Sequence, residues 1–155
     1  MAESVKVVIV DDHDMVRMGL KTYLMLEPSF EVIGEAGNGK ELLDWLDQRP
    51  QEEHPDLVLM DLMMPVMNGA ETTRAVLAKY PSIKIVILTS FLEDDLVVDA
   101  VEAGAVSYVL KTVSADELIY ALQGANRGMP VMTGDVSQAL TRGIRQRTVQ
   151  GDSTG

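Results

Sequence analysis

The sequence has no cysteine, few basic residues and no long apolar segment. Without cysteine, neither a disulfide framework nor a thiolate metal site can form. Only 13 Lys and Arg stand against 24 Asp and Glu, and a net charge of −11 repels a phosphate backbone, which argues against DNA binding by this segment itself. No apolar run approaches the roughly 18 residues that cross a bilayer. The opening, MAESVKVVIV, lacks the basic start and cleavage site of a signal peptide, so we expect a cytoplasmic location without membrane contact.

The 155 residues fit one domain with a substantial core, and apolar runs alternate with helical segments along it. Runs rich in Val, Ile and Leu predict strands over 5–10, 30–35, 56–60, 83–88 and 106–110. The first, third and fourth runs are apolar almost throughout, as expected for central parallel strands covered on both faces. Asn38, Asn68 and Ser114 each stand three residues before a glutamate, a spacing that predicts helix starts.

Strand followed by helix, five times, predicts an α/β fold. Such alternation gives a parallel sheet with right-handed crossovers and helices on both faces. We expect a flavodoxin-like (βα)5 doubly wound parallel sheet with strand order 2-1-3-4-5. Gly104 follows the helical segment 94–103, where a helix end requires a positive φ.

The chain changes character near residue 128. Gly, Met and Pro at 128–130 break the last helix of the alternating part, and a polar tail follows. We therefore predict a domain over 1–127 and a linker or tail over 128–155. Within the tail, a short helix is predicted over 137–149, followed by a disordered end.

Polar residues follow four of the predicted strands at their carboxyl ends. In an open parallel sheet, ligands bind outside this edge, so these residues are expected to lie together. They are Asp11, Asp12, Asp61, Thr89 and Lys111. Taken singly, each has an ordinary interpretation, because an Asp pair can cap a helix, a threonine can occupy a turn and a lysine is usually solvated. Their joint placement at one edge favours a site.

The residue types at this edge indicate phosphoryl transfer. Three nearby carboxylates raise one another's pKa unless a cation lies among them, so a divalent ion is implied. Oxygen ligands without His or Cys favour Mg²⁺. Asp61 follows the central strand and opens a loop, so its carboxylate can act as a nucleophile toward phosphorus. The ion and Lys111 would offset the charge of the transferred group, and a Thr89 hydroxyl that donates to the phosphate could move a loop.

The complete motif comprises Asp11-Asp12, the run Leu-Met-Asp61-Leu-Met-Met-Pro65, Asn68-Gly69, Thr89-Ser90, Gly104-Ala105, Tyr108 and Lys111. Over roughly residues 5–127 it resembles the receiver domain of two-component response regulators. The resemblance implies that Asp61 is the phosphoacceptor and, with Asp11 and Asp12, part of the Mg²⁺ site. Asp12 and the Met63 carbonyl would bind the ion directly, with Asp11 assisting through water. Thr89 and Lys111 would hold the phosphate.

Three positions near the site are open to more than one interpretation. Tyr108 stands at the family's switch position, where an aromatic ring turns inward as Thr89 moves toward the phosphate, but a half-buried strand aromatic is an equal alternative. Family members often have proline after the lysine, whereas this chain has Thr112, which leaves the geometry of that peptide bond open. His13 opens a helix and is interpreted as a polar neighbour of the site.

The stretches Asp12-His13-Asp14-Met15-Val16-Arg17 and Leu110-Lys111-Thr112 resemble the NarL/FixJ class. Members of this class usually add a carboxyl-terminal helix-turn-helix domain of LuxR type. The resemblance implies the receiver portion of a transcription regulator that takes phosphate from a sensor histidine kinase. DNA would be bound only through a domain absent from this chain.

The first predicted helix, over 14–27, carries two apolar stripes. One stripe, with Leu20 and Leu24, suits the core, while Met15, Met18 and Met25 lie on a separate flank. Flexible thioethers suit a surface that packs differently in two states, so we predict a homodimer on phosphorylation through this helix and the fifth helix. Two alternatives stay open: the methionines belong to the core, or the dimer uses the fourth helix, fifth strand and fifth helix.

Other functions on this fold fit less well. An FMN carrier needs backbone amides and hydroxyls around its phosphate, where this chain has Asp11-Asp12-His13-Asp14. A phosphatase with an Asp nucleophile usually has a second catalytic Asp at the position of Met63. An unphosphorylated interaction scaffold stays open as the alternative. We do not expect an enzyme with a separate product, because the domain would catalyse only its own phosphorylation and dephosphorylation.

Overall fold

The computed structural model describes residues 4–154, and their side chains up to residue 149. Five parallel strands form one sheet in the order β2-β1-β3-β4-β5. The strands are β1 (Val5–Val10), β2 (Phe30–Ala36), β3 (Leu57–Met60), β4 (Lys84–Thr89) and β5 (Ser107–Leu110). The predicted α/β fold and strand order are confirmed, and each strand boundary falls within one residue of its predicted place.

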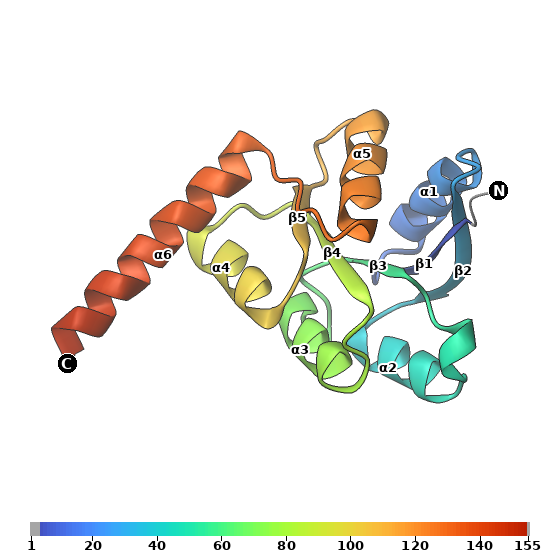
Figure 1. Cartoon of the computed structure of the whole chain (residues 1–155), viewed down its shortest axis with the longest axis horizontal. Coiled ribbons are helices and arrows are strands. Elements are labelled where there is room, and N and C mark those ends of the chain that lie inside the picture. The colour runs from blue at the N-terminus through green and yellow to red at the C-terminus, as the bar shows by residue number, and fades with distance from the viewer. Residues whose placement is uncertain (1–3, 155) are drawn as a thin grey trace.

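Helices cover both faces of the sheet (Figure 1). They are α1 (Asp14–Met25), α2 (Gly39–Asp47), a short 3₁₀ helix η1 (Gln51–Glu53), α3 (Gly69–Lys79), α4 (Asp94–Ala103), α5 (Ala115–Asn126) and α6 (Gly134–Thr154). One core cluster joins the sheet to α2, α3 and α4, and a second joins it to α1 and α5. The continuous apolar strands are therefore buried on both faces, as parallel strands usually are.

The predicted helix boundaries rest on local hydrogen bonds. Asn68 and Glu71 form a reciprocal capping box at the start of α3. The side chains of Asn38 and Ser114 each accept a hydrogen bond from the backbone N–H three residues on. Gly104 ends α4 with a φ of 111°, in the left-handed region that favours glycine. These signals fix where helices begin and end around the edge that carries the site.

The structure corrects the prediction at two helices. The first helix ends at Met25 rather than at residue 27. The helix predicted over 137–149 is present as the longer α6, and helix continues through residue 154, where a disordered end was predicted. Residue 155 lies outside the described residues. α6 lies beside α4 and projects beyond it (Figure 1), with Val136 and Ala139 fully buried.

Two further observations concern the described chain as a whole. The peptide bond between Lys111 and Thr112 is trans, because residues 4–154 contain no cis peptide bond. Across the same residues, no helix combines the length and the apolar character that crossing a membrane requires.

Candidate functional site

The predicted site residues meet at the carboxyl edge of the sheet. Asp11 follows β1, Asp61 follows β3, Thr89 ends β4 and Lys111 follows β5. Asp11 is 2% exposed and Asp61 6%, and Thr89 is fully buried, while Asp12 is open to solvent. Adjacent strand order places these ends side by side, so this edge of the sheet carries two buried acids, Asp11 and Asp61, and one exposed acid, Asp12.

Lys111 connects the two buried carboxylates. Its Nζ lies 3.1 Å from Asp11 Oδ2 and 3.4 Å from Asp61 Oδ2. The other oxygen of Asp61, Oδ1, accepts a hydrogen bond from the backbone N–H of Leu62 at 2.8 Å. Burial raises the pKa of Asp61 above its usual value, although Lys111 acts to lower it, and the nearby charge of Asp11 raises it further. The Lys111 ammonium group therefore forms ion pairs with both buried carboxylates.

His13 lies within this cluster rather than beside it. Its backbone N–H donates to Asp11 Oδ1 at 2.8 Å, and its ring Nδ1 lies 3.1 Å from Asp11 and 3.2 Å from Asp12. Potential ligand atoms of Asp11, Asp12, His13 and Asp61 all lie within 4.8 Å of one another. Converging carboxylates of this kind suit a hard divalent cation, and the imidazole contact was not predicted from the sequence.

Arg17 makes a second set of contacts that were not predicted from the sequence. Its guanidinium group donates hydrogen bonds to the backbone carbonyl of Asp11 and to the carboxylate of Asp14, and its Nε donates to Glu35 at 3.1 Å. Lys21 also donates to Glu35, at 2.7 Å. The only signal in the sequence was the three-residue spacing of Asp14 and Arg17 in one helix turn. The contact anchors the start of α1 to the loop that carries the acidic pair.

Thr89 and Tyr108 share one partner in the loop between β4 and α4. Thr89 Oγ1 accepts a hydrogen bond from the backbone N–H of Phe91 at 3.3 Å, and the Tyr108 hydroxyl donates to the Phe91 carbonyl at 2.5 Å. Tyr108 is fully buried rather than half-buried, and this burial raises the pKa of its hydroxyl. Both residues can therefore act on the position of this loop.

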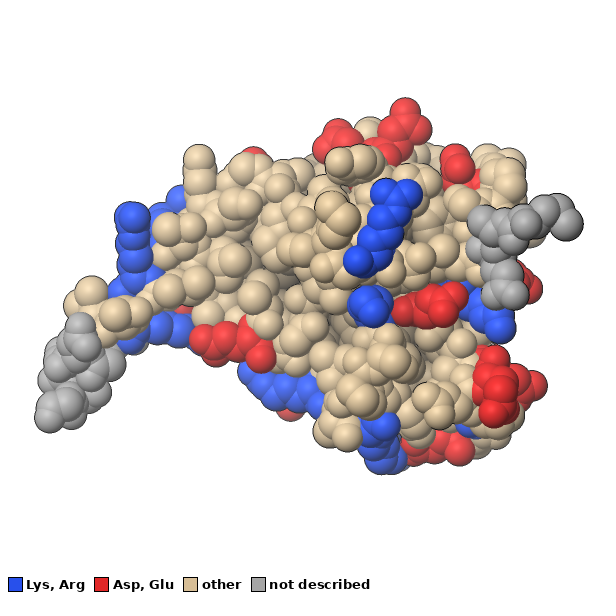
Figure 2. Space-filling model, viewed as in Figure 1, with Lys and Arg blue, Asp and Glu red and all other residues tan. Residues whose placement is uncertain are grey.

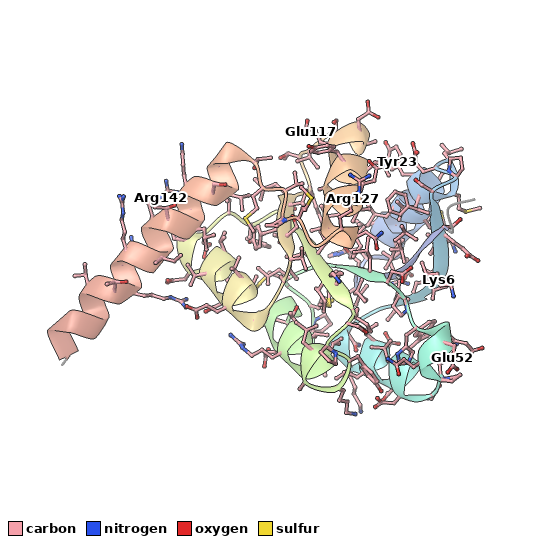
Figure 3. The ribbon with its side chains drawn as sticks, in the orientation of Figure 1. Lys6, Tyr23, Glu52, Glu117, Arg127 and Arg142 are labelled. Atoms are coloured by element: carbon pink, nitrogen blue, oxygen red, sulfur yellow. The ribbon has the colours of Figure 1, made fainter. Side chains whose placement is uncertain are left out.

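The remaining predicted residues lie on the surface. Met63 lies between β3 and α3 with its side chain 48% exposed. Met15, Met18 and Met25 on α1 are 81%, 61% and 72% exposed, so the alternative that they belong to the core is wrong. A cavity of about 370 Å³ lies between α1 and α5, lined by Met15 of the three methionines and by Leu20, Tyr23, Val113 and Leu118 among others. Figure 3 labels Tyr23 on α1.

Comparison with known proteins identifies the family. The family model described as the response regulator receiver domain matches residues 7–123. The chain belongs to this family. It is 41% identical over 141 residues to the transcriptional regulatory protein LiaR of Bacillus subtilis, and the match covers 91% of this chain and 65% of LiaR. The chain thus spans about two thirds of that relative's length.

Solved structures place this receiver domain among regulators of the LuxR type. A LuxR-family response regulator from Aurantimonas is 29% identical with a TM-score of 0.81, over 90% of this chain and 97% of that chain. The receiver domain of the putative response regulator NarL from Mycobacterium tuberculosis is 31% identical with a TM-score of 0.75, over 82% and 99%. The predicted membership in the NarL and LuxR class is confirmed.

Proposed function

We propose that Asp61 accepts a phosphoryl group from the phosphohistidine of a sensor histidine kinase in a Mg²⁺-dependent reaction. The observation that carries the proposal is the buried Asp61 carboxylate, which lies beside Asp11 and 3.4 Å from the Lys111 ammonium at the carboxyl edge of the sheet. The protein would work in the cytoplasm as the receiver of a transcription regulator.

The residues divide the chemistry between them. A carboxylate oxygen of Asp61 forms a bond to phosphorus while the donor's phosphorus–nitrogen bond breaks and its electron pair returns to the imidazole. Lys111 offsets negative charge on the transferred group. Asp11, Asp12, Asp61 and the Met63 carbonyl would hold Mg²⁺, which supplies further charge neutralisation at the phosphoryl oxygens. Hydrolysis of the aspartyl phosphate at the same site resets the switch, so no separate product is turned over.

The switch follows from the hydrogen bonds of Thr89. Without a phosphoryl group on Asp61, the Thr89 hydroxyl accepts a hydrogen bond from the backbone N–H of Phe91. A phosphoryl group on Asp61 offers it a charged acceptor, and hydrogen bonds to charged acceptors are roughly twice as strong as neutral ones. Thr89 would turn toward the phosphate and release Phe91, while buried Tyr108 keeps hold of the Phe91 carbonyl. The loop between β4 and α4 is thereby the first segment to move.

The output surface we favour is the α1 and α5 face. Met15 borders the cavity between these helices, Met18 and Met25 are exposed on the same helix, and a flexible apolar surface of this kind suits a homodimer. Before phosphorylation, the alternative face, formed by α4, β5 and α5, is covered in part by α6. DNA would be bound through a domain beyond residues 128–155, in keeping with the greater length of LiaR.

Incubation with Mg²⁺ and acetyl phosphate, followed by intact-mass measurement, tests the proposal. We expect the wild type to gain the mass of one phosphoryl group, and we expect Asp61→Asn and metal-depleted wild type to gain none. Glu31→Gln, which changes an exposed acid on β2, serves as the control and should be modified like the wild type. A wild type that gains no mass would favour the scaffold alternative, and an adduct that persists in Asp61→Asn would place the acceptor elsewhere.

A further inference from the structure

α6 is packed against α4 through apolar contacts as well as charge. Val136 and Ala139 are fully buried, and Leu140 packs on the core cluster that contains Val97 and Ala100 of α4. Figure 1 shows the two helices side by side. The segment expected to be a linker therefore contributes to the core of the receiver domain.

The two helix backbones approach closely at Gly143. A Cβ atom at this position would lie 2.4 Å from Val98 Cγ2 and 2.9 Å from the backbone carbonyl oxygen of Asp94. Any larger residue would force the helices apart, because real Cβ atoms do not approach backbone atoms this closely. The contact thus depends on the exact position of the first turn of α4.

Two arginines of α6 pair with acidic side chains of α4. Arg142 makes two hydrogen bonds to the Asp94 carboxylate, both at 3.2 Å, and Arg147 donates to Asp99 at 2.8 Å and to Glu102 at 3.0 Å. Figure 2 shows basic side chains gathered at the end of the molecule that α6 forms, in a chain whose net charge is −11. Figure 3 labels Arg142 on this helix. These pairs join the basic side of α6 to the acidic start and flank of α4.

α4 begins where the loop between β4 and α4, residues 90–93, ends, and we call this segment the switch loop. The loop contains Phe91, whose N–H is held by Thr89 and whose carbonyl is held by Tyr108, and α4 begins at Asp94, three residues later. Asp94 is the residue that Arg142 holds. A path of contacts therefore runs from Thr89, at the edge of the sheet that carries Asp61, through the loop between β4 and α4 to α6.

We propose that α6 is a releasable strap on α4, and that phosphorylation of Asp61 loosens it. This inference rests on the proposed function of Asp61. When Thr89 turns to the phosphate, the loop carries the first turn of α4 with it. The close contact at Gly143 cannot follow such a shift, because packed interfaces change between discrete arrangements rather than deform smoothly. Release uncovers the α4 face and exposes the arginines of α6 to other partners.

Thermodynamic linkage makes the coupling reciprocal. If occupation of the acceptor site weakens the strap by a given factor, then releasing the strap by mutation strengthens binding at the acceptor site, by up to that same factor when release is complete. Couplings between distant sites commonly reach about 5-fold or more. The reciprocal effect separates a regulatory strap from a helix that is packed only for stability.

Hydrogen exchange of the full chain tests the strap, with beryllofluoride and Mg²⁺ as the phosphoryl analogue. We expect amides of 134–149 in the wild type to exchange about 5-fold faster, or more, when the analogue is bound. In the Arg142→Glu/Arg147→Glu variant they should exchange fast in both states, and the analogue should half-saturate at an approximately 5-fold lower concentration. Gly143→Ala, which acts through packing instead of charge, should shift both quantities in the same direction.

Arg145→Glu supplies the matched control. Arg145 is exposed on the same helix and has no ion pair among the residues described, so this variant should behave like the wild type. Fluorine NMR of the bound analogue reports occupancy independently. An occupied site with unchanged exchange in α6 would overturn the strap alone, and so would an unchanged analogue affinity in the strap variants. Failure of the analogue to bind at all would overturn the proposed function of Asp61 and the inference that rests on it.

Discussion

Among single residues, Asp61 links the chemistry of the site to the stability of the fold, because the pKa of its carboxyl group differs between the folded and unfolded states. Its pKa is raised in the folded protein, chiefly by burial, while Lys111 acts to lower it. A raised pKa means that the folded state binds the proton more tightly than the unfolded state does. The stability that this proton contributes is present below the ordinary carboxyl pKa of about 4 and is lost as the pH rises through the higher folded value.

Asp61→Asn should therefore raise the melting temperature at pH 7 when Mg²⁺ is absent. The gain should shrink as the pH falls toward about 4, where the wild-type carboxyl group regains its proton. Thermal unfolding in EDTA across this pH range measures the effect, and Glu31→Gln is the matched exposed carboxylate. Identical melting temperatures for wild type and Asp61→Asn at pH 7 would show that burial of the charge costs the fold nothing.

Val66 has an unfavourable backbone conformation, from which we predict the effect of a substitution on stability. It has a φ of 73°, alone among the non-glycine residues of the described chain, and its side chain is 78% exposed. The left-handed region costs about 1–2 kcal/mol for a residue with a Cβ atom, and asparagine tolerates it better than a β-branched side chain does. Val66→Asn should stabilise the protein against urea by about 1 kcal/mol. The control Val149→Asn, on helical α6, should give no gain, and an equal gain would refute the strain argument.

Among the elements, α1 and α5 carry the proposed dimer. Met18→Lys places a charge on the exposed methionine flank, where it would have to lose water for the interface to close. Sedimentation with beryllofluoride and Mg²⁺ should show a dimer for the wild type and at least 10-fold weaker association for Met18→Lys, about 1.4 kcal/mol. Met129→Lys is the control, because both methionines are 61% exposed and Met129 lies outside α1 and α5. Normal dimerisation of Met18→Lys would move the interface to the α4, β5 and α5 face.

At the scale of the whole molecule, the fold and the meeting of the strand ends were predictable because their causes are local. Apolar runs set the strands, side chains such as Asn68 set the helix starts, and parallel order brings Asp11 and Asp61 to one edge. The docking of α6 was not predictable in this way. It depends on Arg142 meeting Asp94, 48 positions earlier, and on the missing side chain of Gly143, while the polar composition of the segment is also typical of a tail.

The account as a whole depends on Asp61 being the acceptor, and chemical trapping tests this most directly. Borohydride cleaves an aspartyl phosphate by reducing the acyl group, which converts the modified aspartate to homoserine. After treatment with Mg²⁺ and acetyl phosphate, then borohydride and protease, peptide mass spectrometry should find homoserine at position 61 and aspartate at positions 11 and 12. Homoserine at position 11 or 12, or at no position in a protein that has gained a phosphoryl group, would contradict the account.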